Sequence, residues 1–160
     1  MDRGEFPPFS GCLILVSPSI RDLQEEGDRL QALGMARLSI GRELSRVLLG
    51  VPPAERAQRA SDWLPERVRA YSPAPLLCSE IDLLFHPDLN IDPLMLFRQS
   101  ARFGDLAVLW PGAISDGWLS YAVPAHRHYN HWYIPTQPPD PPLTIRSLEL
   151  PKEGNVHVLS

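Results

Sequence analysis

The chain has 160 residues, a formal net charge of −4 and a hydrophobic content of 44%. This length is typical of one domain that buries its own core, and the negative charge argues against binding of polyanions by the whole surface. Because no apolar run approaches the ~20 residues of a membrane span and the charged start Met1–Glu5 is unlike a signal peptide, we expect a cytoplasmic protein without membrane contacts.

Strand and helix patterns alternate along the chain, which predicts an α/β fold with a mainly parallel sheet flanked by helices. Gly34 is expected to end the first helix, Ser61 to cap the third, and Asp92 with Pro93 to begin the fourth. The expected strands are 12–16, 36–40, 76–81, 106–110 and 118–123, and the expected helices are 20–33, 42–49, 61–71 and 93–101. Cys12 and Cys78 lie within apolar strands, so we expect both to be reduced core residues.

Proline dominates the chain after Tyr133, with five prolines between residues 135 and 142. Residues 1–134 are therefore expected to form the domain, and residues 135–160 a proline-rich arm that packs on the body or on a partner.

The first strand, the turn Ser17-Pro18-Ser19 and the helix that follows form the setting in which a P-loop stands. A working P-loop reads G-x-x-x-x-G-K-[ST], because glycines let backbone N–H groups wrap the phosphates and the lysine reaches their oxygens. This turn has no glycine, Pro18 removes one N–H donor, and the only lysine of the chain is Lys152. The sequence therefore predicts the fold of an NTPase without the P-loop residues that bind the phosphates.

Several stretches between residues 38 and 133 resemble BrxF, the small P-loop protein of type 3 BREX phage-defence systems. They are Glu43–Leu49, Ile81–Leu89, Asp92–Arg102, and Trp110–Gly112 followed by Leu119–His126. The resemblance covers over half of the chain and implies a P-loop sheet of the RecA/AAA type. It also implies partners among the other proteins of such a system, which include a large ATPase, a DNA methyltransferase and a PglZ-type phosphatase-like protein.

Two departures from this family bear on activity. Its members carry a glycine-rich GK[ST] turn, and their third strand ends in an aspartate for Mg²⁺, where this chain has Ser79. Glu80 or Asp82 takes over that role only if the register of the strand shifts. Without bound phosphates, a lone carboxylate leaves Mg²⁺ no phosphate oxygen to bridge. We therefore expect a pseudo-NTPase with no catalytic residue, cofactor or metal, which serves as a structural or adaptor subunit.

Two other functions stay open. One is a nucleotide site completed in trans, to which Asp82 and Arg102 contribute, although a solvated helix-end residue is the favoured interpretation of Arg102. The other is DNA binding by an arginine-rich region between residues 37 and 69, in which Arg42 and Arg46, like Arg56 and Arg59, lie one helical turn apart. A solvated helix face explains the same pattern of arginines. Self-association of the chain is a further possibility.

Three histidines, His126, His128 and His131, lie among aromatic residues. Their spacing does not place them on one helical face and no cysteine is near, which disfavours zinc. We expect a solvent-facing helix here, with Tyr129, Trp132 and Tyr133 as an aromatic contact stripe for protein partners.

Overall fold

The computed structural model describes residues 9–121, 130–134, 142–148 and 156–159. The strands are β1 (Cys12–Ser17), β2 (Ala36–Ser39), β3 (Leu76–Ser79), β4 (Leu106–Ser115), β5 (Trp118–Tyr121), β6 (Asn130–Tyr133), β7 (Leu143–Ser147) and β8 (Val156–Leu159). The helices are α1 (Ile20–Ala32), α2 (Ile40–Leu48), α3 (Arg56–Tyr71) and α4 (Pro93–Ser100), with the 3-10 turns η1 (Pro53–Glu55), η2 (Ile81–Phe85) and η3 (Pro87–Leu89).

The expected α/β fold with a mainly parallel sheet is confirmed. The strand order is β2-β3-β4-β1-β7, all parallel, and β8 adds antiparallel to β7. β1 lies inside the sheet, where Cys12 pairs with Leu106 on one side and Leu143 on the other. Such a strand is covered on both faces, which explains why its sequence is a continuous apolar run. Within the described part of the chain, no helix is long and apolar enough to span a membrane.

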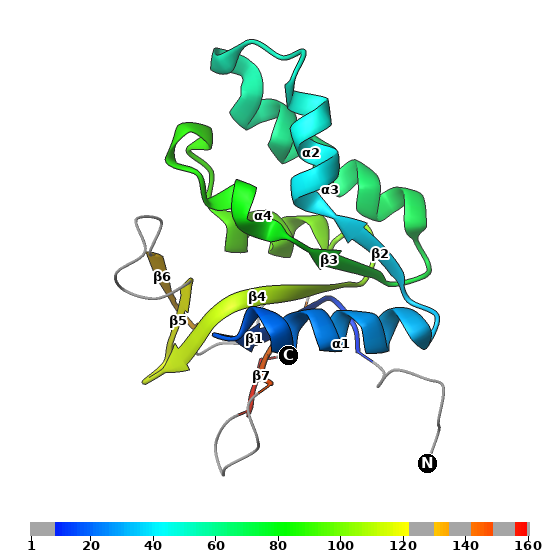
Figure 1. The fold of residues 1–160 in the computed structure, drawn as a ribbon, viewed down its shortest axis with the longest axis vertical. Coiled ribbons are helices and arrows are strands. Elements are labelled where there is room, and N and C mark those ends of the chain that lie inside the picture. The colour runs from blue at the N-terminus through cyan, green and yellow to red at the C-terminus, as the bar shows by residue number, and fades with distance from the viewer. Residues whose placement is uncertain (1–8, 122–129, 135–141, 149–155, 160) are drawn as a thin grey trace.

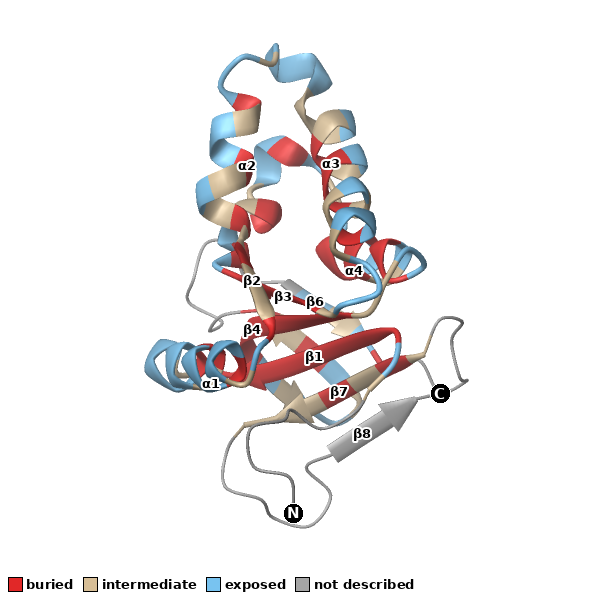
Figure 2. Cartoon of the chain, turned by 90° about the vertical axis from the view of Figure 1, so that its right-hand side faces the viewer, coloured by how far each residue is buried: buried red, intermediate tan, exposed pale blue. Residues whose placement is uncertain are grey.

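Helices cover both faces of the sheet. α1 lies on one face, and α2, α3 and α4 lie on the other (Figure 1). The two faces of β1 serve different cores: Leu13 and Leu15 pack toward Leu23 and Leu30 of α1, whereas the alternate residues join the larger core on the opposite face. Figure 2 shows β1 buried, with the outer side of α1 exposed. Cys12 and Cys78 are both free and buried in the larger core.

β4 is longer than predicted. Instead of ending at Pro111, it continues to Ser115 and exchanges its parallel neighbour β1 for the antiparallel strand β5. Gly112 permits this crossing, because a Cβ there would lie 1.8 Å from the Ser120 carbonyl oxygen. The predicted turn after β4 is present: Asp116 and Gly117 both have positive φ, as a tight hairpin turn requires.

Two expected element boundaries are wrong. α3 starts at Arg56, so Ser61 lies inside the helix and does not cap it. β3 ends at Ser79, because Glu80 adopts a left-handed conformation with φ of 54° and the chain turns into η2. Glu80 and Asp82 therefore do not alternate along a strand.

One prediction about the C-terminal part needs correction. The expected helix around the aromatic residues is wrong for residues 130–133, which form strand β6. Residues 143–147, which belong to the expected arm 135–160, form β7 and hydrogen-bond along the length of β1, so this segment packs on the body. The proline-rich stretch 135–141 lies outside the described residues.

Candidate functional site

The carboxyl ends of β3 and β4 and the side of α1 enclose a small cleft of about 80 Å³. In open α/β sheets ligands bind outside the carboxyl ends of the strands, at the point where the strand order changes direction. Here that point is at β1. The chain leaves β1 for β2 at the edge of the sheet, and the later strands β4 and β7 pair with the two sides of β1. The polar side chains of the cleft come from Gln24, Arg37, Ser79, Glu80 and Asp82.

The turn between β1 and α1 is short and internally hydrogen-bonded. Only Pro18 and Ser19 separate the strand from the helix. The Ser19 side chain accepts a hydrogen bond from the Asp22 N–H at 3.1 Å, and the Ser17 hydroxyl accepts one from the Ser19 N–H at 3.0 Å. Two N–H groups that a phosphate would need are thus occupied, and the Asp22 carboxylate already stands in the first turn, where the helix dipole favours an anion.

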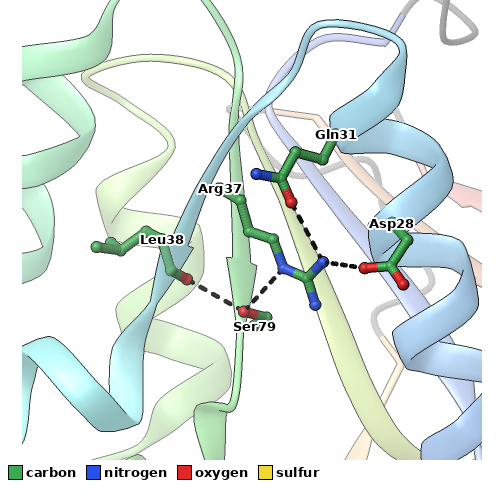
Figure 3. Close-up of polar contacts among 5 residues, drawn as sticks. All are labelled: Asp28, Gln31, Arg37, Leu38 and Ser79. Atoms are coloured by element: carbon green, nitrogen blue, oxygen red, sulfur yellow. Dashed lines mark hydrogen bonds and ion pairs between the residues drawn. The ribbon is translucent and has the colours of Figure 1, made fainter.

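Arg37 extends from β2 across the end of β3 toward α1 (Figure 3). Its Nε lies 3.4 Å from the Ser79 Oγ, and its Nη1 lies 2.8 Å from the Asp28 carboxylate and 3.5 Å from the Gln31 side-chain oxygen. Gly27 makes room for it, since a Cβ at that position would lie 2.9 Å from the guanidinium carbon. A cation therefore stands beside the position where the P-loop resemblance implies a Mg²⁺-binding carboxylate.

Both carboxylates of the cleft have partners within the protein. The Ser39 hydroxyl donates to Glu80, whose carbonyl also accepts the Gly41 N–H at 2.8 Å. The Tyr121 hydroxyl donates to Asp82. Burial, and then the hydrogen bond to Asp82, raises the pKa of Tyr121, so this hydroxyl remains a donor at neutral pH. Neither carboxylate is held ready for a metal ion.

The predicted arginine surface divides into two kinds of side chain. Arg42 and Arg46 are exposed on α2, and within the described residues neither guanidinium has a hydrogen bond or ion pair. In contrast, the Arg56 Nε donates to the Val51 carbonyl at 2.9 Å, and Arg59 pairs with Glu66 at 3.5 Å. Two of the four arginines are thus engaged within the protein, and the other two have no partner among the described residues.

Arg102 lies far from the cleft in the topology of the sheet. It is exposed just after α4 and just before β4, which places it at the amino edge of the parallel strands. It therefore cannot contribute to the cleft of its own chain.

The predicted aromatic stripe is split between the two faces of the β5–β6 hairpin. Trp132 packs inward, 5.2 Å from Trp110 between ring centroids, and its Nε1 donates to Asp92 at 2.9 Å. Tyr133 is 60% exposed and lies 5.0 Å from the ring of Trp118 across the hairpin. The ring of His131 is also 5.0 Å from that of Trp118. The outward surface is thus Trp118, His131 and Tyr133.

Tyr129, His126 and His128 lie outside the described residues, and among those that the structure describes, no cluster of three or more His, Cys, Asp or Glu side chains is arranged to hold a metal ion.

No protein-family model, curated protein or solved structure matches the sequence. The cleft offers neither a free anion cradle nor free carboxylates, whereas α2 and the β5–β6 hairpin offer exposed arginine and aromatic side chains. This arrangement is suited to contacts with other macromolecules.

Two functional features escaped the sequence reasoning, although signals for both were present. Arg37 follows Ala36 and precedes Leu38, so alternation along the strand turns it away from the larger core. Gly27 is the complementary signal, because a glycine inside a helix usually has a packing reason. Trp118 directly follows the Asp116-Gly117 turn, where cross-strand pairing places it opposite the partner strand.

Proposed function

We propose that this chain is a non-catalytic P-loop-type subunit of a bacterial anti-phage complex of the BREX kind, where it acts as an adaptor through protein contacts. The observation that carries the proposal is the occupied carboxyl edge of the sheet. The β1–α1 unit has the strand-turn-helix order of a P-loop, but two residues cannot wrap a phosphate. Arg37 occupies the neighbourhood of Ser79, and Asp82 is bonded to Tyr121.

The resemblance of residues 38–133 to BrxF supports the choice of partners. It favours the large ATPase, the methyltransferase and the PglZ-type protein of the same system. Trp118 and Tyr133 are the side chains we assign to this contact, because they are 41% and 60% exposed and large aromatic residues are frequent at binding hot spots.

The adaptor role is tested in cells that carry the complete defence system. The double variant Trp118→Ser/Tyr133→Ser is expected to lose phage protection and to leave the purified complex, with an affinity lowered roughly tenfold or more. The variant Arg37→Gln alters the cleft and is expected to keep both. Thermal unfolding of each variant checks that the fold is intact.

The alternative of a nucleotide site completed in trans predicts the reverse pattern. Protection would then depend on Arg37 and Asp82 in the cleft and would survive the loss of Trp118 and Tyr133. That outcome would overturn the adaptor proposal, because the cleft would be the working part of the molecule.

DNA binding is a second candidate, favoured by the guanidiniums of Arg42 and Arg46, which have no partner among the residues that the structure describes. If both contact phosphates, Arg42→Ala/Arg46→Ala should reduce the slope of log affinity against log salt by about two. Arg21→Ala/Arg29→Ala on α1 is the matched control, since it removes the same charge from the opposite face of the sheet. Equal slopes for the two double variants would exclude α2 as the DNA contact.

A further inference from the structure

An open groove of about 690 Å³ lies between α2, the beginning of α3 and the η2–η3 segment. Leu48, Leu83 and Leu89 form its apolar floor. Leu48 and Leu89 belong to the larger hydrophobic core, and Leu83 packs against that core. The groove therefore opens the core toward solvent at the end of the molecule where α2 and α3 project from the sheet (Figure 2). An apolar floor of this kind favours an apolar occupant.

Leu49 stands at the edge of this groove and points into solvent. It is 82% exposed, although the preceding residue, Leu48, is buried. Pro53, also exposed, extends the apolar edge beyond the end of α2. The same patch therefore carries both an apolar hollow and a projecting apolar side chain beside it.

The rim carries one charge of each sign. Arg56 lies at the start of α3, where its Nε donates to the Val51 carbonyl at 2.9 Å. Asp88 lies on η3 with its side chain 92% exposed, and its carboxylate is 3.8 Å from the Nδ1 of His86, which also lines the groove. A strongly acidic ligand would meet Asp88, and a strongly basic ligand would meet Arg56. A partner surface is complementary to this rim if it places a negative charge opposite Arg56 and a positive charge opposite Asp88.

We propose that the groove binds a second copy of this chain, in a two-fold symmetric dimer. In such an interface a patch meets itself, so residue i of one copy contacts residue j of its partner and the reverse. The Leu49 side chain of each copy enters the groove of the other, and Arg56 of each copy faces Asp88 of the other. This self-association is separate from the adaptor role, and either one can fail without the other.

The first test is the mass of the full chain in solution, measured by analytical ultracentrifugation from micromolar to sub-millimolar concentration. We expect a monomer–dimer equilibrium whose dissociation constant rises roughly tenfold or more in Leu49→Asp, because a leucine that becomes buried in the dimer interface is replaced by a charge. Met95→Asp on α4 is the matched control, since Met95 is also an exposed apolar residue, at 44%. It should dimerise like the wild type.

Charge reversal identifies the pairing. Arg56→Asp and Asp88→Arg should each weaken the dimer, because each variant brings two like charges together twice. Mixing the two variants should restore association as a heterodimer, since both contacts are then between opposite charges, and the combined variant Arg56→Asp/Asp88→Arg should dimerise by itself. If Arg56→Asp fails to fold because it loses the bond to Val51, Leu49→Asp and Asp88→Arg decide the matter.

Three results would overturn the proposal. They are a monomer at every concentration, a dimer that Leu49→Asp leaves unchanged, and charge variants that fail to rescue one another on mixing. The second would assign the dimer to another surface, and the third would remove Arg56 and Asp88 from the interface.

Discussion

At the residue scale, the two buried thiols make the stability depend on pH in alkaline solution. Burial raises the pKa of Cys12 from an ordinary 9.0 to about 12, and burial, followed by the neighbouring Cys12, raises the pKa of Cys78. In the unfolded chain both thiols ionise near their ordinary value. Below that pH the two states bind equal numbers of protons; above it the native state binds more, so the free energy of unfolding falls as pH rises.

This predicts a slope approaching one proton per thiol between about pH 9 and pH 10. The measurement is urea unfolding across that range. Tyr121 begins to ionise in the unfolded chain toward pH 10, but it does so equally in the wild type and in a cysteine variant, so the difference between their slopes reports the thiols. The double variant Cys12→Ala/Cys78→Ala should be less stable at neutral pH because of the lost packing, but its slope should be flatter by up to two protons. Identical slopes would mean that the thiols are not buried as described.

At the scale of elements, Asp92 connects a helix start to the distant hairpin. Its carboxylate accepts the Met95 N–H at 3.1 Å, which caps α4, and also the Trp132 Nε1–H at 2.9 Å. Ser19 only caps its own helix. Asp92→Ala should therefore lower the free energy of unfolding by about 2 kcal/mol, and Ser19→Ala by about 1 kcal/mol. Denaturant unfolding measures both, and equal losses would show that the bond to Trp132 contributes nothing.

β7 is an element whose loss should affect the whole sheet. Leu143 and Ile145 are fully buried, and their strand covers one edge of β1. A chain that ends before Pro142 should therefore lose cooperative unfolding, because the central strand would be left with an unpaired apolar edge. Circular dichroism during thermal unfolding checks this. A truncated chain that melts as sharply as the full one would place residues 143–147 outside the folding unit.

Local signals in the sequence located most elements but not their tertiary roles. The apolar run of β1, Gly34 after α1 and the Asp92-Pro93 start of α4 each act within a few residues, so they could be recognised. The place of β7 beside β1 depends on residues about 130 positions apart along the chain. The inward turn of Trp132 depends on its partner Asp92, 40 residues away.

The candidate site was predictable to a similar extent. The missing glycines and lysine were visible in the sequence and pointed to the carboxyl edge of the sheet. Gly27 and the strand position of Arg37 were weaker signals, because Arg37 reaches Ser79 and Asp28 only once α1, β2 and β3 are assembled. The place of Trp118 directly after the hairpin turn was a signal of the same kind, whereas the groove beside α2 has no comparable local signal.

At the scale of the whole molecule, the central claim is that the carboxyl edge is occupied by the protein itself. The serine bonds in the β1–α1 turn, the Arg37 guanidinium beside Ser79 and the Tyr121 bond to Asp82 all support it. The exposed surfaces of α2 and of the β5–β6 hairpin are then the parts of the molecule that we propose for contacts with partners.

The most direct test is a calorimetric titration of the purified full chain with MgATP and with MgADP, at protein concentrations that detect sub-millimolar binding. The occupied edge predicts no saturable heat for either nucleotide, and Arg37→Gln should not create any. Stoichiometric binding that Arg37→Gln or Asp82→Asn alters would contradict the claim, because it would show that the cleft holds phosphates by means other than a P-loop.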